Sequence, residues 1–204
     1  MSDPNADERP SADPDPLEER VIDSNVLHRG RYLEFRIDTI ERADGSRATR
    51  DVVGHPGAVA VIAIDDDDRI LLVRQWRSPA GRALLEIPAG TLDVHGGVTE
   101  DPEAAVRREL EEETGQRARS WRRLTEFWPA PGFASEFMHL YLATDLESIT
   151  GDGRLAPDED ERLEVSRVSL DDALALVDGG GICDAKSIVA ILWLDRLRRA
   201  GSLG

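Results

Sequence analysis

Two short runs of apolar residues constrain the fold of this chain most strongly. GAVAVIAID begins at residue 57 and RILLVRQW at residue 69, with an acidic stretch at 65–68 where they adjoin. Both runs are rich in Val, Ile and Leu and are shorter than a typical helix, so each predicts a strand covered on both faces. Such strands need other elements on each side. We therefore expect an α/β (α+β) domain, layered as an α/β/α sandwich around a mixed central sheet.

The other patterns predict further strands and helices around this centre. An antiparallel β hairpin is expected within residues 31–53, with Asp44 and Gly45 at its turn. A helix is expected between the capping residue Asp101 and Gly115. The remaining expectations are strands in ALLEIPAG, RSWRRLTEFW, EFMHLYLAT and RLEVSRVSL, a loop in TLDVHGGVTE, a helix from Ser169 to the glycines at 179–181, and a last helix over 184–199.

Composition divides the chain into three segments. Residues 1–22 combine Pro, Asp, Glu and Ser with few apolar side chains, which predicts a disordered acidic tail. Residues 23–56 are interpreted as an N-terminal β region, and residues 57–204 as one catalytic domain. Cys183, the single cysteine, is expected to be a small buried residue.

The charge balance is strongly acidic, with 41 Asp and Glu against 25 Lys and Arg and a formal net charge of -16. Duplex nucleic acid is therefore not expected as a partner. Salt screens repulsion between like charges, so a halophilic source is favoured over an ordinary acidic cytosolic protein. No apolar run is long enough to span a bilayer, and the N-terminus lacks a signal pattern, which predicts a cytoplasmic protein without a membrane partner.

The stretch RRELEEETG, residues 107–115, crowds like charges into the predicted helix. At about 100° per residue, one helical face collects Glu109, Glu112 and Glu113. Glu111 falls on the far side, where Arg107 four residues earlier is expected to offset it. Crowded carboxylates are costly unless a cation lies among them, and Mg²⁺ prefers oxygen ligands. A solvated acidic face is the alternative.

Taken together with residues upstream of it, the same stretch resembles the sequence box of the Nudix hydrolases. PAG from Pro88 is followed by Glu100 and then, after seven residues, by Arg108. Two departures stand out: Gly90 and Glu100 enclose nine residues, more than the family pattern has, and Gln116 occupies an apolar position. The longer loop leaves the role of Glu100 open. The residues that match position by position are Arg108, Glu109, Leu110, Glu112, Glu113 and Gly115.

Further segments are similar to the ADP-ribose pyrophosphatase branch of that family. They are HPGAVAVIAI, ILLVRQWR, LLEIPAG and DAKSIVAILWL, together with Pro131, sixteen residues after Gly115, and the resemblance covers roughly residues 26–199. The resemblance implies hydrolysis of ADP-ribose to AMP and ribose 5-phosphate, or hydrolysis of the diphosphate bond of a related nucleoside diphosphate sugar. It also implies a homodimer whose N-terminal strands reach the partner. The alternatives are GDP-mannose, NADH or an oxidised dNTP as substrate, and a non-catalytic module that senses ADP-ribose.

The resemblance also assigns roles to residues. Metal ligands would be Glu109, Glu112, Glu113 and the Ala89 carbonyl, holding Mg²⁺ or, as the alternative, Mn²⁺. Arg108 would orient a helix glutamate. Catalytic roles fall to Glu112, Glu113 and an acidic-loop carboxylate, Glu161 before Glu159. Substrate contacts would come from Arg77, Arg50, Glu86 and Pro131. Trp76 and Trp128 are candidates to stack on an adenine, although a place in the core or at an interface is favoured for each.

Overall fold

The computed structural model describes residues 15–149, 155 and 162–202. The chain divides into two compact units. One comprises Met1–His55 with Gly132–Ser135, and the other comprises Pro56–Pro131 with Glu136–Gly204. Each is described below by itself. No helix among the described residues has the length and apolar character that crossing a membrane requires.

The first unit is a three-stranded antiparallel sheet in the order β1-β2-β3, formed by β1 (Glu19–Arg29), β2 (Glu34–Arg42) and β3 (Arg47–Gly54). The predicted hairpin is confirmed as β2 and β3, with Gly45 at a left-handed φ of 79° in its turn. The expected tail is wrong at its end, because β1 begins at Glu19 rather than after residue 22. β1 pairs antiparallel with β2, from the pair of Glu19 with Arg42 to the pair of Arg29 with Glu34, which extends the hairpin to a sheet.

The second unit contains the mixed sheet. Its order is β10-β11-β4-β7, from β10 (Gln116–Phe127), β11 (Met138–Ser148), β4 (Ala58–Ala63) and β7 (Ala89–Thr91). β11 runs parallel to β4, whereas the other pairs are antiparallel. A second antiparallel sheet has the order β12-β5-β6, from β12 (Leu163–Val168), β5 (Ile70–Arg77) and β6 (Arg82–Glu86). The predicted strands and the mixed sheet are confirmed.

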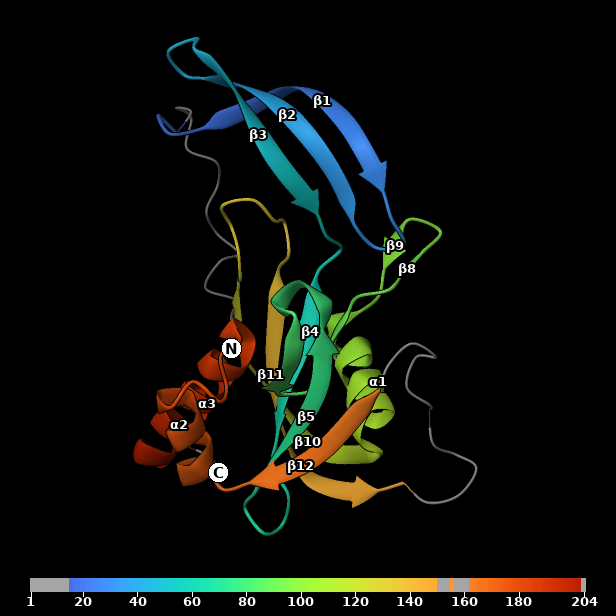
Figure 1. The fold of residues 1–204 in the computed structure, drawn as a ribbon, viewed down its shortest axis with the longest axis vertical. Coiled ribbons are helices and arrows are strands. Elements are labelled where there is room, and N and C mark those ends of the chain that lie inside the picture. Colours follow the sequence, from blue (N-terminus) through green and yellow to red (C-terminus); the bar gives the residue numbers. More distant parts are fainter. Residues whose placement is uncertain (1–14, 150–154, 156–161, 203–204) are drawn as a thin grey trace. The chain divides into compact units, whose positions relative to one another are not determined.

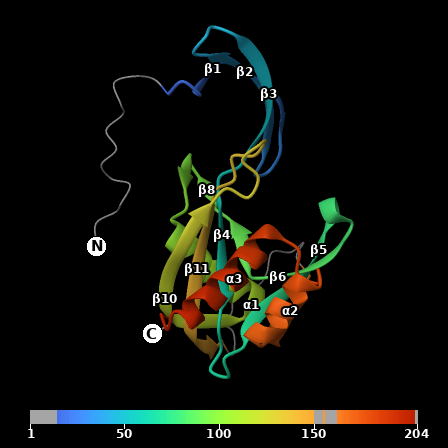
Figure 2. The ribbon, with the colours of Figure 1, turned by 90° about the vertical axis from the view of Figure 1, so that its left-hand side faces the viewer.

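Both faces of the central strand β4 are buried, as the apolar run predicted. Ala60 and Ile62 belong to a cluster that includes residues of α2 (Leu170–Asp178) and α3 (Ala185–Arg199). Val59 and Val61 belong to a second cluster that includes residues of α1 (Pro102–Thr114). Within this unit α1 therefore covers one side and α2 with α3 the other (Figures 1 and 2). The α/β/α sandwich is confirmed.

The predicted helix boundaries are confirmed by their caps. The Asp101 carboxylate accepts a hydrogen bond from the Ala104 amide, Pro102 opens α1, and Gly115 ends it at a left-handed φ of 67°. Ser169 caps α2 and Asp184 caps α3 in the same way. Capping satisfies amide groups that have no partner within the helix. The Asp101 cap sets the first turn of α1 and therefore the position of its glutamates relative to the helix start.

The long loop before Glu100 is a small hairpin. β8 (Val94–His95) pairs with β9 (Val98–Thr99) across two glycines with positive φ, which corrects the expectation of an irregular loop. The Asp93 amide donates to the Glu100 carboxylate, and the Glu100 amide donates to the Asp93 carbonyl at 2.8 Å. These two hydrogen bonds close the hairpin at its base, so the extra residues do not displace Glu100, which still contacts Arg108 of α1.

Cys183 differs from expectation, and Gln116, a departure from the family pattern, has a local explanation. Cys183 is exposed rather than buried, and Arg82 donates to its Sγ at 3.0 Å. Gln116, at an apolar position of the family pattern, is buried, and its amide nitrogen donates to the Ser148 hydroxyl at 3.1 Å. A satisfied polar side chain can replace an apolar one there at little cost.

Candidate active site

Arg108 lies at the centre of the glutamate face of α1. Its Nη1 contacts carboxylate oxygens of Glu109 at 2.9 Å and of Glu112 at 2.8 Å. Its Nε and Nη2 donate to the two oxygens of Glu100 at 3.3 and 2.9 Å. A guanidinium fork suits this bidentate geometry, and it gathers three carboxylates despite their repulsion. The lengthened loop therefore leaves Glu100 able to hold Arg108 in place.

The backbone at Ala89 and Gly90 lies directly against this face. The Ala89 amide donates to Glu113 Oε2 at 3.0 Å. A Cβ placed on Gly90 would lie 1.9 Å from Glu109 Oε1, closer than any real contact. Glu109 and Glu113 are both buried, at 8% and 2% exposure. The structure therefore brings two of the predicted helix ligands, Glu109 and Glu113, against the strand at Ala89 and Gly90.

Glu111 lies apart from this group, as predicted, but its charge is not offset by the predicted partner, Arg107. Arg117 Nε and Nη2 donate to its carboxylate at 2.7 and 2.9 Å. This hydrogen bonding lowers the pKa of Glu111. Arg107 instead contacts Glu103 at 2.6 Å and lies over the Trp121 ring. The prediction for Arg107 is wrong, because Arg117, which lies beyond the end of the helix, pairs with the buried Glu111 carboxylate instead.

The chemistry of the residues fits a hard divalent cation, although the described residues hold no preassembled cluster of three His, Cys, Asp or Glu ligands. The reason is visible in the contacts, since Arg108 draws two of the carboxylates to itself. Residue 90 has no room for a side chain, because the Glu109 carboxylate lies where its Cβ would be. Oxygen ligands converging from a helix and a strand are what Mg²⁺ and Mn²⁺ prefer.

A second charged group surrounds Glu86, at the end of β6. Arg77 Nε and Nη2 donate to its two oxygens at 2.9 and 2.8 Å, and Lys186 of α3 also donates to it. Glu86 is 1% exposed. Burial alone would raise its pKa, but the hydrogen bonds from Arg77 and the charge of Lys186 outweigh that and lower it. The two predicted substrate residues thus form one ion-paired group.

This group predicts a pH-dependent stability. Because the folded pKa of Glu86 lies below the unfolded value of about 4.3, its stabilisation is full above pH 4.3 and is lost as the pH falls through the folded pKa. We expect Glu86→Gln to lower the free energy of unfolding by about 2 kcal/mol at pH 7, less than for a fully buried pair because Arg77 is partly solvated. Urea denaturation of both proteins from pH 7 to pH 3 tests this, and a difference that does not shrink below pH 4.3 would contradict it.

Other predicted residues are not brought into these groups. Arg50 lies in β3 of the first unit, where its Nε donates to Glu19 at 2.9 Å. Pro131 is exposed at the end of a segment of the second unit. Glu161 and Glu159 lie outside the described residues. Trp76 and Trp128 are 63% and 58% exposed, so neither is a core residue.

Sequence reasoning missed Lys186, Asp184 and the closing contact of Asp93 with Glu100. Lys186 could have been singled out, because it is the only lysine in the chain. Nothing in the linear sequence places it beside Glu86, since the two are separated by 100 positions. Asp184 was recognisable only as the start of a helix.

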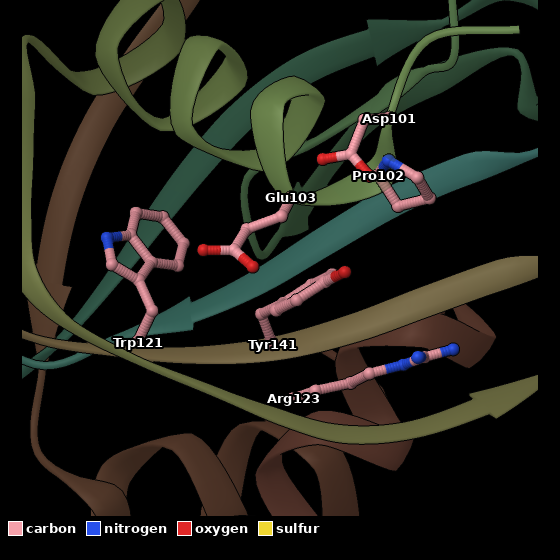
Figure 3. Close-up of a pocket in the computed structure, with 6 residues that line it drawn as sticks. All are labelled: Asp101, Pro102, Glu103, Trp121, Arg123 and Tyr141. Atoms are coloured by element: carbon pink, nitrogen blue, oxygen red, sulfur yellow. The ribbon is translucent and has the colours of Figure 1, made fainter. Parts of the chain in front are cut away.

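A hollow of about 230 Å³ lies elsewhere in the second unit, near the start of α1 (Figure 3). It is lined by Asp101, Pro102, Glu103, Trp121, Arg123 and Tyr141. None of the predicted metal or substrate residues is among them. The candidate site is therefore the glutamate face and not this hollow.

Comparison with known proteins agrees with this geometry. The NUDIX domain family matches residues 54–187, which include both charged groups. The chain belongs to the NUDIX family. This NUDIX chain is 41% identical over 178 residues to an ADP-ribose pyrophosphatase of Bacillus subtilis (strain 168), covering 87% of this chain and 93% of the relative. It is also 38% identical over 178 residues to a methanol dehydrogenase activator of Bacillus methanolicus, with the same coverage of 87% and 93%.

Comparison with a solved structure supports the fold. The crystal structure of an ADP compounds hydrolase superposes with a TM-score of 0.76 at 22% identity, covering 94% of this chain and 100% of the other. At that identity the similarity concerns the fold. The two relatives are named for different activities, so a substrate for this NUDIX protein has to be proposed from its site together with the similarity.

Proposed function

We propose that this NUDIX protein hydrolyses the diphosphate bond of ADP-ribose to AMP and ribose 5-phosphate with the help of Mg²⁺. The observation that carries the proposal is the placement of Glu113 and Glu109 of α1 against Ala89 and Gly90, with Arg108 contacting both Glu109 and Glu112. The similarity to an ADP-ribose pyrophosphatase over 87% of the chain supports the choice of substrate. The products follow when water adds to one phosphorus and the bridging P–O bond breaks.

The residues would divide the work. Glu109, Glu112, Glu113 and the Ala89 carbonyl would hold the cation, which supplies positive charge to the diphosphate oxygens. Arg108 gathers Glu109 and Glu112 and is itself held by Glu100. Arg77 would bind a phosphate oxygen through its remaining N–H groups. Glu112 and Glu113 would also help to orient water, and Glu161, or else Glu159, is proposed as the carboxylate that takes its proton.

A substrate panel tests the proposal. We expect AMP and ribose 5-phosphate from ADP-ribose with Mg²⁺, weaker turnover with Mn²⁺ or with other substrates, and none in EDTA. Chromatographic assay of ADP-ribose, GDP-mannose, NADH and 8-oxo-dGTP, at low and high salt, makes the comparison. Faster turnover of another compound would replace the substrate assignment. Binding of ADP-ribose without turnover of any compound would favour the sensing module.

The assembly of the protein and its cellular environment are also proposed. Exposed apolar side chains on the first unit, Val21, Leu27 and Phe35 among them, are suited to a homodimer interface. The net charge of -16 supports a halophilic cytoplasm, where salt screens repulsion. Pro131 and Arg50 remain proposed substrate contacts. Light scattering at several salt concentrations would test the assembly, and a monomer throughout would reject it.

A further inference from the structure

We propose that Lys186 is a positioning residue for catalysis, acting through Glu86 to keep Arg77 available to the substrate diphosphate. The inference rests on the proposed function and adds a role for the only lysine of the chain. It does not require Lys186 to touch the substrate. Its basis is the order of contacts around one buried carboxylate.

Glu86 holds both cations at once. Arg77 donates from Nε to Glu86 Oε1 and from Nη2 to Glu86 Oε2. The Lys186 ammonium also donates to Oε2. Lys186 is 13% exposed and Arg77 is 38% exposed, so the lysine is the inner cation and the arginine the outer one. The accessible part of Arg77 is the part that can meet an anionic ligand.

The charges explain why a second cation matters. A diphosphate that binds Arg77 competes with Glu86 for the same guanidinium. If Arg77 were the only partner of Glu86, this competition would leave a buried carboxylate uncompensated, which is costly. Lys186 remains on Glu86 and shares the charge, so Arg77 can turn part of its hydrogen bonding outward. The effect is a lower cost of binding rather than a new contact.

The position of Lys186 is itself fixed by the first turn of α3. Its Nζ donates to Asp184 at 2.9 Å, and Asp184 also accepts from the Ser187 amide as the helix cap. The Ser187 hydroxyl accepts from the Ile87 amide at 2.9 Å, next to Glu86 in the chain. This turn therefore fixes the segment that leads into Ala89 and Gly90. The Lys186 ammonium thus lies between two carboxylates, those of Glu86 and Asp184.

Two variants and a control test the role by kinetics. We expect Lys186→Met to raise KM for ADP-ribose about tenfold with kcat changed less than about threefold, because a binding cost is added. Lys186→Arg should restore most of the loss, since it returns the charge. Arg82→Met is the control, because Arg82 is an exposed cation nearby that contacts Cys183. Equal KM values for the Met variant and the wild type, both folded, would overturn the proposal.

A second readout does not depend on turnover. Lysine labelled with ¹³C and ¹⁵N enters the chain at one position, so the side-chain NMR spectrum reports Lys186 alone. We expect its signal to shift when inorganic pyrophosphate and Mg²⁺ are added, and the shift to disappear in Arg77→Met. An unchanged signal at saturating pyrophosphate would overturn the proposal. Lack of ADP-ribose turnover with a shifting signal would instead reject the proposed substrate and keep the role of Lys186.

Discussion

Glu113→Gln is expected to lower kcat for ADP-ribose about 10³-fold while the protein stays folded. Glu113 is 2% exposed and accepts the Ala89 amide. The glutamine carbonyl can accept the same hydrogen bond, so the backbone contact survives. What is lost is the negative charge, and with it one proposed ligand of the cation. Steady-state kinetics at several Mg²⁺ concentrations, with circular dichroism to confirm folding, measures the effect.

The same helix offers a matched control for that variant. Glu111→Gln removes a carboxylate of the same kind that is paired with Arg117 and accepts from the Leu155 amide. We expect its kcat to stay within about twofold of the wild type, with a slightly lower Tm because the ion pair between the buried Glu111 carboxylate and the largely exposed Arg117 is weakened. If Glu113→Gln kept more than a tenth of wild-type turnover, or if both variants lost activity alike, the glutamate face would not be the catalytic site.

Gly90→Ala is expected to raise the Mg²⁺ concentration for half-maximal activity by 10 to 100 fold, roughly. The added Cβ would lie 1.9 Å from Glu109 Oε1 and 2.0 Å from its Cδ, so the carboxylate has to move. The left-handed region is not involved at Gly90, so the effect comes from the contact. Overpacking of this kind costs about 1 to 3 kcal/mol of stability as well. Activity measured against Mg²⁺, together with urea denaturation, separates the two effects.

Gly30→Ala is the control for the added methyl group. A Cβ at Gly30 meets its nearest atoms at 3.5 and 3.7 Å, which are ordinary contacts. Its Mg²⁺ dependence should match that of the wild type. An unchanged Mg²⁺ requirement in Gly90→Ala would mean that Glu109 is not a ligand, whatever the change in stability.

Much of the fold was accessible from local patterns. The apolar runs at β4 and β5, the caps Asp101, Ser169 and Asp184, and Gly115 at the end of α1 are all signals carried by neighbouring residues. The hairpin β8-β9 was missed because its two short strands have no apolar alternation long enough to recognise. The start of β1 was missed because its polar residues resemble the tail before them.

The candidate site was predictable to a different extent. The spacing of RELEEETG singled out Glu109, Glu112 and Glu113, since helical geometry alone puts them on one face. The partner of Glu111 was predicted wrongly, because Arg117 lies beyond the helix end and no helical rule relates it to residue 111. Glu161 stays a prediction, as it lies outside the described residues.

The sequence by itself determined the elements and the face of α1 that bears the glutamates, because both follow from periodicity within a few residues. Only the tertiary structure decided what lies opposite that face. Gly90 packs against Glu109, Arg108 is held by Glu100 across the hairpin, and Lys186 reaches Glu86 from 100 positions away. These pairings depend on how strands and helices stack, and a buried charge selects its partner by distance in space rather than by separation along the chain.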